Sequence, residues 1–233
     1  MKKLTLLFLL SLGLSSFKFL SGDCGSLLFF KEGTSTTMAT YNDDGKLTGT
    51  VKTLYTAVSK TPSGLSVKAQ QESFDKKGKS AYKADYTIRC EKGILLFDMK
   101  MMMPDQQSDT YKDFEMTMEG NEKEIPSDFV VGSSLKDSNI KFKFKTKEGM
   151  EMAMMNMAVK ISNRKVATKE SVTTSAGTFD CYKITEDMEI KTLFTTKMKT
   201  TTWFNMEVGT VKSETYKDNG KFKGRTELTA INR

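Results

Sequence analysis

One short pattern occurs three times in the 233-residue chain and limits what the chain can fold into. An aromatic residue is followed, after three positions, by Gly-Lys at residues 41–46 (YNDDGK), 74–79 (FDKKGK) and 216–221 (YKDNGK). Glycine supplies the positive φ that a tight turn between two strands requires. Aspartates in all three segments leave a repeated ligand loop as the alternative, but a calcium loop needs oxygen ligands at alternating positions. The pattern therefore predicts three β-hairpins.

Apolar and polar residues alternate in the segments between such turns. Ile140, Phe142 and Phe144 fall on one face, and four lysines at the intervening and following odd positions fall on the other. Residues 155–161 alternate in the same way. A period of two residues is typical of an antiparallel strand that has one face in the core. These segments predict half-buried strands.

The composition extends this interpretation to the whole chain. Threonine, phenylalanine, tyrosine and valine recur, and only three prolines occur, without a linker that would divide the chain. We therefore predict an all-β, single-domain protein, built as a strongly curved antiparallel sheet or a partly closed β-barrel. Residues 104–111 are expected to form at most one short helix, and residues 126–139 a loop with one short extended piece.

The N-terminus has the features of an export signal. Lys2 and Lys3 precede an apolar run at residues 4–14 that is too short to span a bilayer, which needs about 20 residues. We predict a signal peptide at residues 1–22 and a β domain at residues 23–233, exported to the periplasm, the cell surface or the medium. No later stretch is apolar enough to span a membrane. Lipidation of Cys24 is the less favoured alternative, because Asp23 stands where a small residue is expected.

The net charge argues against nucleic acid as a partner. Removal of the signal segment, which contains three lysines and no acid, lowers the formal net charge from +7 to +4. The remaining lysines alternate with acids along the chain, as on the solvated faces of strands.

Three cysteines are present, at positions 24, 90 and 181. Two of them can pair in an oxidising compartment. Cys181 lies in residues 178–184 (TFDCYKI), which have the pattern of a buried strand, where a thiol acts as a small apolar group. We therefore predict a Cys24–Cys90 disulfide, with three free thiols as the alternative.

Catalytic machinery is hard to find in this chain. With no histidine, neither a Ser-His-Asp nor a Cys-His arrangement can form, and three cysteines are too few for a four-cysteine zinc site. No P-loop, GxGxxG or GxSxG motif occurs. A catalytic carboxylate pair stays open, although the acids lie mostly in turns or on polar faces. The expectation is a protein without enzymatic activity, catalytic residues, metal or cofactor.

Methionine is the ambiguous signal. The chain has sixteen, and Met150, Met152 and Met154 share one parity, as do Met99, Met101 and Met103. Three interpretations compete: an irregular core filled by flexible side chains, a groove for lipid or another apolar small molecule, and a thioether site for Cu(I). For the groove, the candidate ligand-binding residues are Met150, Met152, Met154 and Trp203. The alternative function is a structural or interaction module that binds another envelope protein.

The chain also carries a family likeness. Residues 163–166 (NRKV), 170–184 (ESVTTSAGTFDCYKI) and 208–216 (VGTVKSETY), together with Trp203 and the Asp23–Cys24 pair, resemble TapB-like exported bacterial proteins. Ser175 departs from the pattern, since proline is expected before Ala176-Gly177. The resemblance implies an exported antiparallel β protein, related to exported domains of unknown function, and it supplies no catalytic residues.

Overall fold

The computed structural model describes residues 26–99 and 113–233. Thirteen antiparallel strands form a single sheet, and in the described ranges the only helices are two 3-10 turns, η2 (Leu28–Phe30) and η4 (Ala153–Met155). The predicted all-β fold is therefore confirmed. The signal segment at residues 1–22 and the short helix at residues 104–111 lie outside the described residues.

The strands follow one another along the chain mostly as hairpins. Their bounds are β1 (Ser35–Asn42), β2 (Leu47–Thr61), β3 (Gly64–Asp75), β4 (Ser80–Glu91), β5 (Ile94–Phe97), β6 (Phe114–Gly120), β7 (Lys123–Pro126), β8 (Ser138–Thr146), β9 (Met157–Thr174), β10 (Gly177–Lys191), β11 (Thr195–Asn205), β12 (Gly209–Lys217) and β13 (Phe222–Asn232). In the sheet the order is β6-β8-β9-β10-β11-β12-β13-β1-β2-β3-β4-β5-β7.

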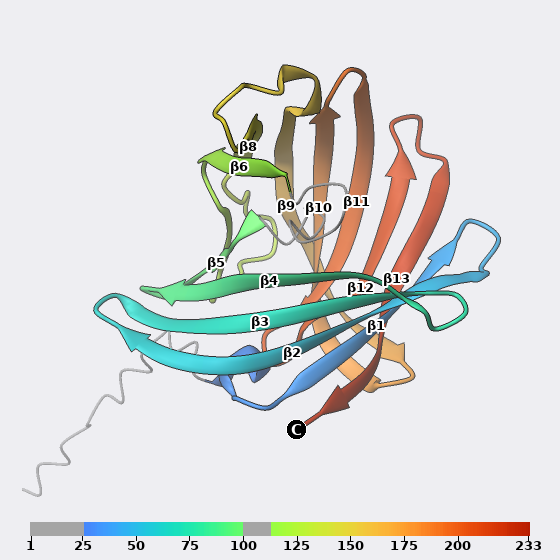
Figure 1. The fold of residues 1–233 in the computed structure, drawn as a ribbon. Helices are drawn as coiled ribbons and strands as arrows, with labels where there is room; N and C mark the ends of the chain where they lie inside the picture. The colour runs from blue at the N-terminus through green and yellow to red at the C-terminus, as the bar shows by residue number, and fades with distance from the viewer. Residues whose placement is uncertain (1–25, 100–112) are drawn as a thin grey trace, which may run out of the picture.

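The two edge strands of this sheet are neighbours in the chain. β6 ends at Gly120 and β7 begins at Lys123, so their Cα atoms lie within about 11 Å of each other. A sheet can meet this constraint only by curling until its two edges approach. Figure 1 shows the result: β2, β3 and β4 cross in front of β9, β10 and β11, with β5 and β6 between them.

The three predicted turns are hairpin turns. They join β1 to β2, β3 to β4 and β12 to β13. In each, the glycine has a positive φ and its N–H donates to the carbonyl three residues earlier, as from Gly78 to Asp75 at 2.9 Å. The lysine that follows each glycine is exposed. Turn chemistry alone was enough to predict these connections.

The predicted alternation is confirmed in β8 and in most of β9. Ile140, Phe142 and Phe144 are buried, and Met157 is the first residue of β9. The segment between these strands differs from its sequence pattern. Residues 147–156 form a turn followed by η4, not a strand, because Thr146 is already bonded to Met150 across a tight turn. The loop predicted at residues 126–139 is present, with one extended contact at Ser134 and β8 beginning at Ser138.

Three apolar clusters form the core. The largest joins strands from both halves of the sheet, such as β3 and β10, and therefore lies inside the curl. A second cluster, inside the curl next to β6 and β8, contains Met99 and the half-buried Met116, Met118, Met157 and Met188. We call it the methionine cluster. The third lies on the outer face, where the end of the β9–β10 hairpin packs over β13.

Gly120, the last residue of β6, tests whether the close approach of β6 to β8 at this point matters for folding. A Cβ at this position would lie 2.0 Å from the backbone oxygen of Asn139, and φ is +120°. Gly120→Ala is expected to lower the free energy of unfolding by clearly more than Gly78→Ala, for which the cost of a positive φ is about 1–2 kcal/mol and no atom lies within 4 Å. Chemical denaturation of the two variants compares them, and equal losses would contradict this account.

Candidate functional site

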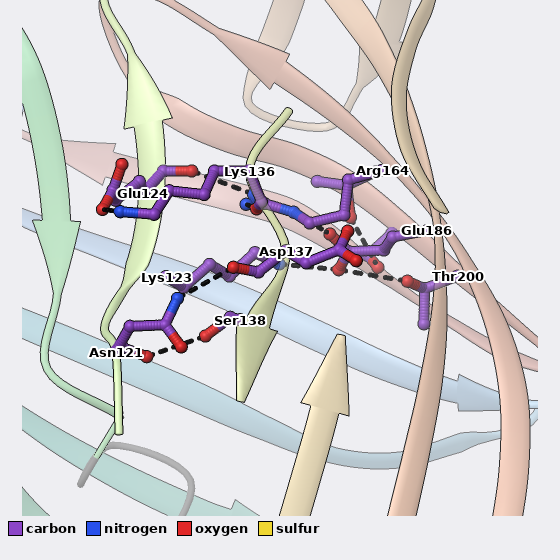
Figure 2. Close-up of polar contacts among 11 residues, drawn as sticks. Asn121, Lys123, Glu124, Lys136, Asp137, Ser138, Arg164, Glu186 and Thr200 are labelled. Carbon is purple, nitrogen blue, oxygen red and sulfur yellow. Dashed lines mark hydrogen bonds and ion pairs between the residues drawn. The ribbon is translucent and has the colours of Figure 1, made fainter. Parts of the chain in front are cut away.

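A group of charged side chains lies inside the curled sheet (Figure 2). Arg164 of β9 has a fully buried side chain, and the side chain of Glu186 on β10 is 3% exposed. The Nε atom of Arg164 lies 3.3 Å from Oε2 of Glu186, and Nζ of Lys123 on β7 lies 2.6 Å from Oε1. Thr200, the partner of Glu186 in the β10–β11 register, donates its hydroxyl to Oε1 at 3.2 Å. We call Lys123, Arg164 and Glu186 the buried ion triad.

Arg164 also bonds to the backbone of β7 and of the loop between β7 and β8. Its Nη2 donates to the carbonyl of Glu124 in β7 at 3.0 Å, and its Nη1 donates to the carbonyl of Lys136. Lys136 in turn lies 2.5 Å from the carboxylate of Glu124. One guanidinium therefore connects β9 to the edge strand β7 and to the loop that precedes β8.

A second set of polar contacts forms at the connection between β6 and β7. Asn121, between β6 and β7, donates from Nδ2 to the carbonyl of Asp137 at 2.8 Å and accepts the N–H of Asn139 at 2.8 Å. The hydroxyl of Ser138 donates to the carbonyl of Asn121 at 2.9 Å. Side chains and backbone thus bond the β6–β7 connection to the start of β8 (Figure 2).

The triad keeps Glu186 ionised. Burial alone would raise the pKa of its carboxyl group, but the adjacent charges of Lys123 and Arg164 and their hydrogen bonds outweigh burial and lower the pKa below its ordinary value of 4.5. Two cations then surround one carboxylate, so the triad carries one excess positive charge.

A cavity of about 220 Å³ adjoins the triad. Most of its described wall is apolar, and three residues of the triad, two threonines and a serine supply the polar part. The lining residues are Phe97, Met99, Lys123, Ile125, Ile161, Arg164, Ile184, Glu186, Met188, Thr202, Phe204, Thr210 and Ser213. They come from β5, β7, β9, β10, β11 and β12, together with Met99, so the cavity exists only because the sheet curls. Met99, Ile161 and Met188 belong to the methionine cluster as well.

Comparison with known proteins assigns the chain to a family. The sequence profile described as DUF3108-like matches residues 31–228. The chain belongs to the DUF3108-like family. A comparison with the curated proteins gave no match.

Two solved structures share the fold of this DUF3108-like protein. A presumed exported protein with YmcC-like fold from Bacteroides fragilis NCTC 9343 is 24% identical with a TM-score of 0.70, over 87% of this chain and 97% of the other. A presumed lipoprotein from Parabacteroides distasonis ATCC 8503 is 22% identical with a TM-score of 0.69, over 88% and 98%. At these identities the likeness describes the architecture alone.

The methionines predicted to bind a ligand do not line the cavity of the DUF3108-like protein. Met150 and Met154 are 68% and 73% exposed, in the turn between β8 and β9. Met152 is half-buried and packs on the methionine cluster. The methionines that do line the cavity are Met99 and Met188. Met101 and Met103 lie outside the described residues.

Trp203 faces away from the cavity. It lies between two lining residues of β11, Thr202 and Phe204, and so points to the opposite face of the sheet. Its indole N–H donates to Glu170, and the amines of Lys183 and Lys212 lie 5.2 and 4.8 Å from the ring centroid. These contacts give Trp203 a structural role on the outer face.

Two of the three cysteines are in the states that the sequence predicted: Cys181 is free and Cys90 is paired. Cys181 is a free thiol buried in β10, where burial raises its pKa to about 11. Cys90 in β4 is disulfide-bonded. Cys24, its predicted partner, lies outside the described residues.

Metal and membrane candidates were sought in the same part of the chain. Residues 26–99 and 113–233 contain no group of three or more cysteine, aspartate or glutamate side chains placed to hold a metal ion. In these residues no helix has the length and apolar character needed to cross a membrane.

The buried ion triad was not predicted from the sequence, although the position of Glu186 in β10 pointed to it. In β10, Glu186 stands between Ile184 and Met188 on the inward parity, so a charge occupies a core position. A buried carboxylate needs a cationic partner. The sequence does not say which of the many lysines and arginines supplies it, since Lys123 is 63 residues away.

Removing Arg164 tests the triad. Arg164→Met is expected to lower the free energy of unfolding by about 3–5 kcal/mol, because it leaves Glu186 and two backbone carbonyls short of partners inside the protein. Lys143→Met, which removes an exposed ion pair with Glu119, is the matched control and should cost far less. Urea denaturation measures both, and a similar loss in the two variants would contradict the role given to Arg164.

The pH dependence of stability tests the charge state of Glu186. A carboxyl whose pKa is lower in the folded protein than in the unfolded chain stabilises the fold above its ordinary pKa, and this contribution is lost as the pH falls through the folded value. The stability of the parent protein should therefore fall more steeply below about pH 4.5 than that of Glu186→Gln. Urea midpoints between neutral and acidic pH measure the two slopes, and parallel slopes would show that the fold does not lower the pKa of Glu186.

Proposed function

We propose that this protein binds a small amphiphile, with an apolar body and an anionic head, in the cavity of its curled sheet. The observation that carries the proposal is the combination of an apolar wall with an excess positive charge at the same cavity. Methionine in the wall suits a flexible chain, because its side chain repacks around different shapes.

The size of the cavity supports a small ligand. An apolar cavity of about 150 Å³ in another protein takes up benzene, and about 220 Å³ offers more room than that. The volume is smaller than that of most ligand pockets, which begins near 300 Å³. A short acyl chain suits this volume better than a diacyl lipid does.

The charges support an anionic head. Glu186 neutralises one of the two cations that line the cavity, and Lys123 keeps a partly exposed side chain. Arg164 is already bonded to Glu186 and to two carbonyls, so Lys123 is the cation with free capacity to meet a ligand. A lysine amine has three donors, of which Glu186 takes one here.

The proposal is one of binding and not of catalysis. The carboxylate and the two cations of the triad are bonded to one another, whereas a general acid or base must reach a proton of the substrate. Neighbours named as an exported protein and a lipoprotein support an envelope location for this chain too. The alternative to ligand binding is a structural or interaction module, whose partner would be another envelope protein.

Decanoate and decanol separate the contribution of the anionic head to binding from that of the apolar chain. Decanoate is expected to bind the purified protein about tenfold more tightly than decanol, since they share a chain and differ in the head. Lys123→Gln should remove most of this preference. Native mass spectrometry and calorimetric titration measure both. Equal binding of the two compounds would contradict the anionic head, and binding of neither would contradict the proposed function.

Filling the cavity locates the binding. Met188→Trp places a larger side chain in the wall and should abolish decanoate binding, whereas Met150→Trp, in the exposed turn, should leave it unchanged. Thermal unfolding of both variants checks that they are folded. Loss of binding in Met150→Trp with retention in Met188→Trp would place the ligand at the methionines that the sequence predicted.

A further inference from the structure

The turn between β10 and β11 exposes two large apolar side chains side by side. Leu193 and Phe194 are 64% and 81% exposed, the latter more than any other large apolar residue described. The turn is ordered by its own hydrogen bonds: the N–H of Thr192 donates to the carbonyl of Phe194 at 3.0 Å, and the N–H of Phe194 donates to the hydroxyl of Thr192 at 3.4 Å. We call Leu193 and Phe194 the apolar tip.

The neighbouring turn adds to this apolar surface. Within the sheet, β8 to β11 are consecutive, so the β8–β9 and β10–β11 turns lie at the same end of adjacent hairpins. The β8–β9 turn carries Met150 and Met154. Four of the eight exposed large apolar residues among those described therefore lie in these two turns. Figure 1 shows the β10–β11 turn projecting beyond the body of the sheet at its upper end.

Lysines surround the apolar tip. Residues 189–199 contain three lysines and one acid, and residues 216–223, in the β12–β13 hairpin at the same end, contain three lysines and one aspartate. All six lysines are exposed. Residues 145–156, in the β8–β9 connection, carry two lysines and two glutamates, whose charges cancel. The apolar tip is therefore flanked by excess positive charge in its own hairpin and in the β12–β13 hairpin.

We propose that this end of the protein docks on an anionic lipid surface, with Leu193 and Phe194 inserted among the headgroups. A projecting turn fits a deformable phase, whereas a protein partner would need a matching pocket for it. Since the backbone groups of the turn bond to one another, insertion leaves few of them without partners. The surrounding lysines then lie at the level of the phosphates, where anionic lipid attracts them.

This proposal stands apart from the cavity. None of the residues of the apolar tip or its lysines lines the cavity beside the buried ion triad. Failure of decanoate binding therefore leaves the lipid surface untouched, and failure of docking leaves the cavity untouched.

Vesicle sedimentation tests the docking. The full chain should sediment with vesicles of phosphatidylcholine that contain about one third phosphatidylglycerol, and about tenfold less with phosphatidylcholine alone. Leu193→Ser with Phe194→Ser should weaken binding to the anionic vesicles at least about tenfold. Raising the salt concentration should weaken the binding of the parent protein, because the lysines act through screened charge.

A matched control is present elsewhere on the surface. Val130 and Val131 are also adjacent, apolar and exposed, at 64% and 52%, but they lie in the loop beside the middle of β9. Val130→Ser with Val131→Ser should leave vesicle binding unchanged. The proposal is overturned if the parent protein stays in the supernatant, or if both double variants bind equally. A parent protein that is dimeric without lipid, with a monomeric tip variant, would assign the tip to a second copy of the chain and also overturn it.

Discussion

The ion pair between Arg164 and Glu186 is the contact on which the shape of this protein depends. Thirteen strands in a linear order leave two edges, and a connection of two residues between β6 and β7 forces those edges together. No ladder pairs β6 with β7, but the loop after β7 bonds to β9 through its backbone between Gly132 and Leu135. Arg164 adds a side-chain bridge at the same place, since its guanidinium bonds to Glu186 on β10 and to the carbonyls of Glu124 and Lys136.

Contacts between charged groups at this place have a consequence that apolar packing would not have. Charges of this kind contribute little net stability compared with packed apolar side chains, but they demand specific partners and so favour one arrangement of the edges. The excess positive charge beside the cavity follows from the same three residues.

Local sequence patterns were enough to predict much of the fold. They predicted little of the site, because the site depends on contacts between residues far apart in the sequence. The turns at residues 41–46, 74–79 and 216–221 follow from glycine and its φ, and the alternation in β8 follows from burial of one face. The triad joins residues 22 to 63 positions apart, which no local pattern records. The alternation of Met150 and Met154 was misleading for a physical reason: a tight turn at Thr146 ends the strand before them.

Two sets among the described methionines have opposite surroundings once the sheet is curled. Those whose parity continues through a strand, such as Met157 and Met188, turn inward and fill the irregular space beside Phe142 and Phe144. Met150 and Met154, in the turn between β8 and β9, are exposed to solvent at the same end as the apolar tip. The same flexible side chain thus serves an interior that must adapt in volume and an end that projects into its surroundings. Exposure, which depends on where the strands stop, decides between the two roles.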